Sequence, residues 1–285
     1  MELRIRFWGV RGSIATPGEG TLRTGGNTSC VEVRCGDRAL VLDAGTGLRA
    51  LGERMLAGGE REVTLLLSHL HWDHIQGLPF FVPAWLPGHR VEIVGAPAGG
   101  SLRGALAAQM RAPHFPVTLE DMGAELSFTE LGHGGRLAFG EVTVTAAALD
   151  HPGGVLAYRV ERGGRSVVYA TDSEHGDGPD PRLVALARGA DLLIYDAMYT
   201  ADEYAGRVGP SRVGWGHSTW EAGVAAADAA GVGRLVLFHH DPRRGDDAVD
   251  AIEAAAARAR PGTLAAREGM ELVVAAGDAG GRRAA

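Results

Sequence analysis

The stretch that decides the fold reads Ser68-His69-Leu70-His71-Trp72-Asp73-His74. It holds four side chains of the kinds that bind metals, directly after the apolar, β-favouring run at residues 63–67. That run predicts a buried strand, so the cluster begins where the strand ends. His69 and His71 are two residues apart and face one side in extended geometry, whereas Asp73 and His74 follow where the chain must turn. We therefore expect two metal ions, one held by each pair.

The pattern His-x-His-x-Asp-His after a strand resembles the signature of the metallo-β-lactamase fold. The Ser-His-Leu-His form resembles the phosphodiesterase branch of that superfamily, which includes ribonuclease Z. The run at residues 71–81, with the turns at 9–13, 25–30 and 43–47, resembles a bacterial group within that branch. The resemblance implies a four-layer αββα sandwich, an α/β fold with two sheets inside and helices outside. It is specific for the fold but not for a substrate.

Length and composition fit one soluble domain. The chain has 285 residues, 45% of them hydrophobic, with neither a Pro/Ser-rich linker nor an internal repeat. We expect a single metallo-β-lactamase-fold hydrolase domain over residues 1–285, with a frayed tail at 278–285. Cys30 and Cys35 lie within one strand-like run and should not form a disulfide with each other. With no signal peptide or membrane-spanning run, we expect a cytoplasmic protein without membrane contact, either alone or as a homodimer.

The charge balance restricts the chemistry. The formal net charge is -7, which argues against a long nucleic acid as the main substrate. Every basic residue among the 28 Lys and Arg is an arginine, and this excludes Schiff-base chemistry on a lysine. Together with the resemblance to the phosphodiesterase branch, which implies a phosphodiester substrate, this balance leads us to expect a small-molecule phosphodiester as the partner.

Histidine and aspartate recur where predicted strands end. His151 follows the predicted strand at residues 142–147, and Asp172 follows the one at 166–170. Asp196 comes directly after the strand at 192–195, and His239 directly after the strand at 235–238. The first motif adds His69. Each has a simple explanation as a polar residue at a strand end. Together they predict one cluster, because successive strands can deliver such groups to one edge of a sheet.

The family resemblance implies a ligand for each metal position. His69, His71 and His151 match the ligands of the first metal, and Asp73 and His74 match ligands of the second. Asp172 matches the aspartate that bridges both metals, and His239 matches the last ligand, with His240 as its adjacent competitor. We expect two divalent ions, zinc first and manganese or iron as alternatives, because sites built from His and Asp do not discriminate sharply among them.

The resemblance also implies a catalytic group made of Asp73, Asp196 and His217. Asp196 occupies the position of a glutamate in ribonuclease Z, one carbon longer, and His217 opens a His-Ser-Thr motif of that family. By analogy, Asp196 orients His217, and His217 protonates the leaving oxygen. The simpler alternative is that His217 only precedes a helix at 219–230, for which Ser218 and Glu221 form a capping-box pattern.

Other residues near these motifs have structural and functional interpretations. Asp43 and Asn27 end turns beside strands, where they serve the turn or support metal ligands. Four aromatic residues after the first motif are expected mainly in the core: Trp72, Phe80, Phe81 and Trp85. In residues 99–134 we expect one helix at 101–110 and a strand near 125–130. This region lacks the long Gly- and Lys-rich arm with which ribonuclease Z grips transfer RNA.

Three functions compete. The first is a dinuclear phosphodiesterase that acts on a small or cyclic nucleotide or phosphodiester, with a hydroxide shared by the two metals as the nucleophile. The second is a hydrolase of a carbonyl substrate, such as a lactone, thioester or β-lactam. The third is a non-catalytic sensor of metal or nucleotide, which the loss of a ligand would indicate. Every expected ligand is present, and the Asp196–His217 pair favours the first.

Overall fold

Two seven-stranded sheets form the centre of the computed structural model, which describes residues 2–97 and 100–275. In spatial order the first sheet contains β14 (Glu271–Ala275), β1 (Glu2–Gly9), β2 (Cys30–Cys35), β3 (Arg38–Leu42), β4 (Glu62–Leu66), β5 (Arg90–Gly95) and β6 (Glu125–Glu130). The second contains β13 (Leu264–Ala265), β12 (Arg234–Phe238), β11 (Leu192–Asp196), β10 (Arg165–Ala170), β9 (Val155–Arg162), β8 (Val142–Leu149) and β7 (Arg136–Phe139).

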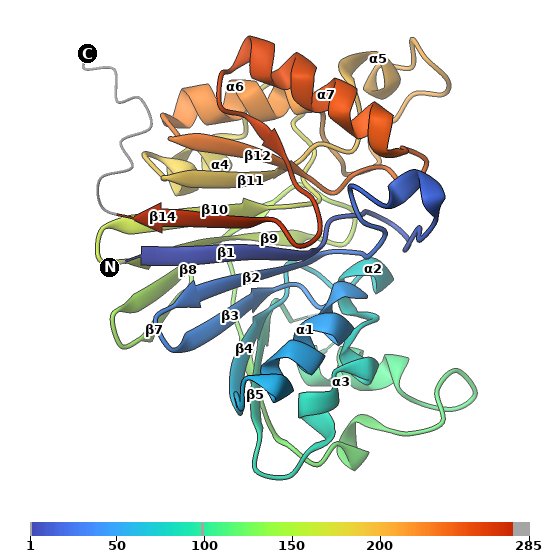
Figure 1. The fold of residues 1–285 in the computed structure, drawn as a ribbon, viewed down its shortest axis with the longest axis vertical. Coiled ribbons are helices and arrows are strands. Elements are labelled where there is room, and N and C mark those ends of the chain that lie inside the picture. Colours follow the sequence, from blue (N-terminus) through green and yellow to red (C-terminus); the bar gives the residue numbers. More distant parts are fainter. Residues whose placement is uncertain (1, 98–99, 276–285) are drawn as a thin grey trace.

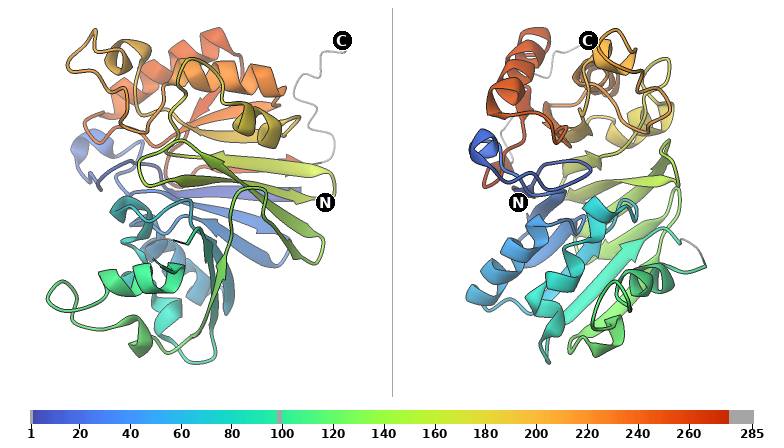
Figure 2. Two further views of the ribbon diagram at one scale, coloured as in Figure 1. Left: turned by 180° about the vertical axis from the view of Figure 1, so that it is seen from behind. Right: turned by 90° about the vertical axis from the view of Figure 1, so that its right-hand side faces the viewer.

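Helices cover the outer face of each sheet. The first sheet carries α1 (Gly47–Ala57) and α3 (Leu102–Gln109), and the second carries α4 (Pro181–Ala187), α6 (Trp220–Ala230) and α7 (Asp246–Ala259). Figure 1 shows the helices above and below the two sheets, and the side view in Figure 2 shows the same layers. The predicted αββα sandwich is confirmed.

Periodic apolar residues account for these layers. In β1, Leu3, Ile5 and Phe7 alternate with polar neighbours and enter a core shared by the two sheets. In α1, Leu48 and Leu51 recur at helical spacing and pack against the opposite face of the first sheet. Each sheet is thus covered on both faces, and its strands are apolar enough to be buried there.

Parallel pairing brings several strand ends to one edge. Strands β3 to β6 are parallel in the first sheet, and β10 to β13 are parallel in the second. The carboxyl ends of parallel strands meet at the same edge of a sheet, where α/β proteins bind their ligands. Two short helices, α2 (Trp72–Ile75) and α5 (Ala201–Tyr204), lie in the connections beyond this edge. The loops after β4, β10, β11 and β12 therefore lie at this edge, and the loop after β8 adds His151.

The predicted elements agree with the structure at most positions. The hairpin of β9 and β10 turns at Gly163 and Gly164, which both have positive φ. Strand β7 and helix α4 were not predicted, because each is short and only partly apolar. The predicted frayed tail at 278–285 lies outside the described residues. No helix in the described part of the chain is both long and apolar enough to cross a bilayer.

One expectation about aromatic residues is wrong in part. Phe81 is fully buried and Trp85 is partly buried, but Trp72 and Phe80 are 78% and 57% exposed. Asp73, His74 and Ile75 occupy the buried side of α2, and the Trp72 side chain faces solvent. Phe80 packs edge-on against Phe115, with ring centroids 5.8 Å apart.

Candidate metal centre

Strand ends hold the candidate ligands Asp172 and His239, and their neighbour Asp43, in unusual backbone geometry. Asp43, Asp172 and His239 are non-glycine residues with φ between +49° and +63°, a region that costs energy for a residue with a side chain. Asp43 directly follows the buried strand β3, and His239 directly follows β12. Asp172 comes two residues after the end of β10. Rigid strands therefore support the strained turns that bring Asp172 and His239 together and place Asp43 behind His74.

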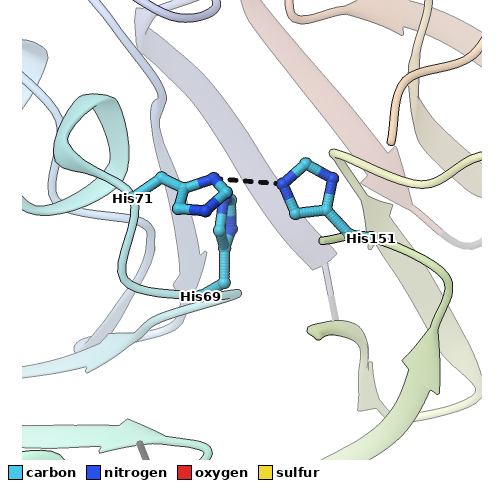
Figure 3. Close-up of side chains that lie close together, drawn as sticks. All are labelled: His69, His71 and His151. Atoms are coloured by element: carbon cyan, nitrogen blue, oxygen red, sulfur yellow. Dashed lines mark hydrogen bonds between the residues drawn. The ribbon is translucent and has the colours of Figure 1, made fainter. Parts of the chain in front are cut away.

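The first group consists of His69, His71 and His151, which come from the loops after β4 and β8. The Nδ1 atom of His71 lies 3.1 Å from Nε2 of His151, as Figure 3 shows. His151 Nδ1 donates to the Gly216 carbonyl at 2.8 Å, which leaves its Nε2 free to face the group. The Ser68 hydroxyl lies 3.0 Å from His69 Nδ1, so His69 also presents Nε2.

The second group consists of Asp73, His74, Asp172 and His239, all buried. His239 Nε2 lies 3.2 Å from Asp73 Oδ2 and 3.1 Å from Asp172 Oδ1. His74 Nε2 lies 3.2 and 3.3 Å from the same two oxygens. Four ligand atoms thus surround one point.

Asp172 faces both groups with different oxygens. Its Oδ1 atom lies beside His74 and His239, whereas its Oδ2 atom lies 3.7 Å from His69 Nε2 and 3.9 Å from His151 Nε2. One carboxylate thus contacts both groups of candidate ligands. The structure therefore brings together all seven residues that the sequence suggested as ligands.

Hydrogen bonds from a second layer fix the orientation of the ligands. The Nδ1–H group of His74 donates to Asp43 Oδ2 at 2.7 Å, which leaves Nε2 for a metal. Asp43 also accepts from the Ser68 amide and hydroxyl and from the Tyr169 hydroxyl, at 2.7 to 2.8 Å. The supporting role considered for Asp43 is consistent with these contacts. The side-chain amide of Asn27 instead donates to Glu268 at 3.0 Å.

The chemistry of the donor set fits divalent metal ions. The Nε2 atoms of His69 and His74 are buried and make no hydrogen bond with any residue in the described ranges. Burial lowers the pKa of His69 well below its usual value and keeps the imidazole in the neutral form that binds metals. Burial disfavours charge on His74 too, but Asp73, Asp172 and Asp43 raise its pKa well above the usual value. The carboxylates around the second group thus stabilise a positive charge there, as a bound cation would supply.

Asp196 and His217 lie beside the second group. His217 Nδ1–H donates to Asp196 Oδ2 at 2.9 Å, and the same nitrogen lies 3.7 Å from Asp172 Oδ2. Burial disfavours the imidazolium, but the charge and hydrogen bond of Asp196 outweigh it and raise the pKa of His217 to about 9. His217 lines a cleft of about 490 Å³ together with Asp172, Asp73, His71, Trp72, Leu70 and Ser13.

The structure corrects one prediction near His217, the cap of α6, and decides between His239 and His240 as the candidate ligand. Thr219, not Ser218, caps α6, because its hydroxyl accepts from the Ala222 amide at 3.1 Å. The Ser218 hydroxyl instead contacts Tyr195 and His175 at 2.8 and 2.9 Å. His240 points away from the centre and bonds the Ala266 carbonyl at 2.9 Å, so the choice of His239 agrees with the geometry.

Sequence reasoning missed Ser13. Its amide donates to Asp73 Oδ2 at 2.7 Å, and its φ is +62°. The Gly12-Ser13 turn was identified, but a serine in the left-handed region gives no signal in the sequence. The carboxylate of Asp73, 60 residues later in the sequence, stabilises this conformation.

Comparison with known proteins identifies the family. Residues 38–240 match the family model described as beta-lactamase superfamily domain. The chain belongs to the metallo-β-lactamase superfamily. A ribonuclease Z from Mycobacterium sp. (strain KMS) is 32% identical over 227 residues, which cover 74% of this chain and 76% of the relative. The superfamily expected from the first motif is therefore confirmed.

Solved structures of the metallo-β-lactamase superfamily share the fold. The metallo-beta-lactamase fold protein YhfI from Bacillus subtilis superimposes with a TM-score of 0.70 at 22% identity, covering 96% of this chain and 99% of that one. The short form of human tRNase Z superimposes with a TM-score of 0.66 at 21% identity, covering 94% and 98%. Together with the matched family, the convergent His and Asp side chains confirm the expectation of a metal-dependent hydrolase.

Proposed function

We propose that this chain is a dinuclear metal-dependent phosphodiesterase that acts on a small or cyclic nucleotide or another small phosphodiester. The observation that carries the proposal is the position of Asp172, whose two oxygens face two separate ligand groups. His69, His71 and His151 would hold one ion, and Asp73, His74 and His239 the other, with Asp172 between them. Zinc is the expected metal, with manganese or iron as alternatives.

Two divalent ions, when bound, supply a water of lowered pKa and positive charge beside the phosphoryl oxygens. The chain itself holds the candidate ligands in position by hydrogen bonds. Asp73 accepts from the Ser13 amide at 2.7 Å, which fixes the carboxylate at the edge of the cleft. A phosphodiester suits such a site, because its two non-bridging oxygens can lie along the line between the two groups.

His217 is placed to act on the leaving group. Its Nδ1–H is held by Asp196, which is fully buried, so its Nε2 atom is the free nitrogen of the ring. Because His217 lines the cleft, Nε2–H can donate a proton to the leaving oxygen as the P–O bond breaks. Asp196 would orient the ring and stabilise its cationic form, although it is one carbon shorter than the glutamate of the related family.

The surface charge supports a small substrate over transfer RNA. The net charge is -7, and the segment between α3 and β6, green in Figure 2, carries few basic residues. Arg103, in α3 just before this segment, is already paired with Glu120 at 3.2 Å. Phosphate contacts on a long nucleic acid need several free cations.

A hydrolysis panel on metal-replete protein tests the proposal. Bis-p-nitrophenyl phosphate and cyclic nucleotides should be cleaved, with close to two metal ions per chain by elemental analysis. Cleavage of a lactone, a thioester or a chromogenic β-lactam, but of no phosphodiester, would favour the carbonyl alternative. Full metal content without hydrolysis of any substrate would favour a sensor.

A further inference from the structure

We propose that Trp72 is the nucleobase platform of this site and selects a nucleotide diester that carries a single negative charge. This inference rests on the proposed phosphodiesterase function and names its substrate class. Trp72 lines the cleft at the metal centre, directly between the candidate ligands His71 and Asp73. Its indole ring is available to a ligand, because the residue is 78% exposed.

Trp72 lies on the solvent side of α2 and leaves most of its surface outside the core. A tryptophan that contributes to stability buries most of its large surface. The neighbours of Trp72 cannot turn the ring inward, because Asp73 and His74 occupy the buried side of α2. An aromatic ring at the edge of a catalytic cleft can instead stack on a planar group, and stacking accepts any nucleobase.

The other residues of the cleft define the rest of the substrate. Leu70 and Trp72 form its apolar side, while Ser13, Asp172 and His217 are polar. The Ser13 hydroxyl makes no hydrogen bond with any residue in the described parts of the chain, so it can bond a sugar hydroxyl.

No lysine or arginine is among the seven lining residues, so a second phosphate would lack a partner beyond the metal centre. A nucleoside cyclic monophosphate has the required parts, namely one base, one sugar and one singly charged diester.

The first experiment compares two substrates that differ only in the base. Metal-replete wild type and Trp72→Ala are assayed on adenosine 2′,3′-cyclic phosphate and on 1-O-methylribose 2′,3′-cyclic phosphate. Stacking of one base accounts for about a 5- to 150-fold effect. The ratio of kcat/KM for the nucleotide to kcat/KM for the base-free diester should fall by that factor in Trp72→Ala, mainly through KM. Trp72→Phe should restore part of the ratio.

Phe80→Ala is the matched control. Phe80 is also an exposed aromatic residue, at 57%, and it is not among the lining residues of the cleft. Its replacement should leave the substrate ratio as in wild type. An unaltered ratio in Trp72→Ala, or an equal fall in Phe80→Ala, would overturn the proposed platform.

A binding measurement separates this inference from the proposed function. AMP should quench the tryptophan fluorescence of metal-replete wild type, and ribose 5-phosphate should not. The quenching should disappear in Trp72→Ala. If wild type cleaves no phosphodiester, the proposed function fails, and Trp72-dependent quenching by AMP would still support the platform. If AMP quenches neither protein or both equally, the platform itself is wrong.

Discussion

Asp43 is the residue on which the second ligand group depends for its orientation. Its carboxylate accepts from His74 Nδ1–H, from two groups of Ser68 and from the Tyr169 hydroxyl. These bonds join the loops after β3 and β4 to the second sheet, where Tyr169 lies in β10. The left-handed backbone of Asp43, with φ of +63°, is held in place by the same bonds.

Asp43→Asn should therefore weaken metal binding without removing a ligand. An amide cannot offer His74 the same charged acceptor, and loss of such a partner typically costs about 10- to 100-fold in metal affinity. Competition with a chelator during metal titration measures this change. Asp191→Asn is the control, because Asp191 accepts from Ser166 and Arg165 at the amino end of β11. Equal metal affinity in Asp43→Asn and wild type would contradict the supporting role.

His217→Ala should slow turnover by about 10²- to 10⁴-fold while both metals stay bound, which is the usual contribution of general acid catalysis. The loss should be smaller for p-nitrophenyl esters, because their leaving group needs no proton. Turnover on good and poor leaving groups, with metal content measured in parallel, tests this. Equal losses on the two substrates would remove His217 from the acid role.

Cys35 should titrate only in strong alkali. Burial raises the pKa of its thiol to about 11, although Arg162 and Arg38 oppose the shift. The native state then holds its proton more tightly than the unfolded state, so stability is complete below about pH 9 and is lost as pH rises toward 11. Alkylation of Cys35 in a Cys30→Ala variant should be slow at pH 8 and fast in urea. Rapid alkylation of the native protein at pH 8 would contradict this assignment.

At the level of elements, the loop between α5 and α6 connects His217, the proposed acid, to the first group of candidate ligands. Glu174 accepts from the amides of Gly214 and Gly216 and from the Tyr204 hydroxyl. Gly216 in turn receives the hydrogen bond of His151 through its carbonyl oxygen. The position of this loop therefore determines the orientation of both His151 and His217.

Gly216→Ala should disrupt the first metal group. A Cβ atom at Gly216 would lie 2.3 Å from His151 Nδ1, and the residue has φ of +81°. Gly214→Ala is matched for backbone strain, with φ of +82°, but its Cβ would meet nothing within 4 Å. Elemental analysis should show less metal in Gly216→Ala than in Gly214→Ala, and similar thermal destabilisation from strain. Equal metal content in the two variants would show that His151 tolerates the displacement.

Much of the candidate site could be predicted from the sequence, because its candidate ligands follow buried strands. The apolar runs before His69, Asp172 and His239 predicted both the strands and the edge at which they meet. The exposure of Trp72 could not be predicted, since it depends on which neighbours face inward. The strained turn at Ser13 was equally hidden, because its partner Asp73 is 60 residues away. Contacts between distant loops leave no periodic pattern in the sequence.

At the scale of the whole molecule, the candidate centre joins the two sheets. His69, Asp73 and His74 belong to the loop after β4 of the first sheet, whereas Asp172 and His239 follow β10 and β12 of the second. Clustered carboxylates and imidazoles at this junction are costly without a cation, because burial removes their hydration. Metal binding should therefore stabilise the contact between the two halves of the sandwich.

Thermal stability should accordingly depend on free metal concentration. A ligand that binds only the folded state stabilises it by about 1.4 kcal/mol for each tenfold rise in free concentration above Kd, and by twice that for two equivalent sites. The Tm should rise steadily in a series of zinc buffers and fall after chelation. Asp172→Ala should flatten this dependence most, because Asp172 is the residue that faces both ligand groups. Asp191→Asn should leave it intact. A Tm that does not respond to free zinc or manganese, in protein that retains its secondary structure, would show that the seven side chains do not form a metal centre that joins the sheets.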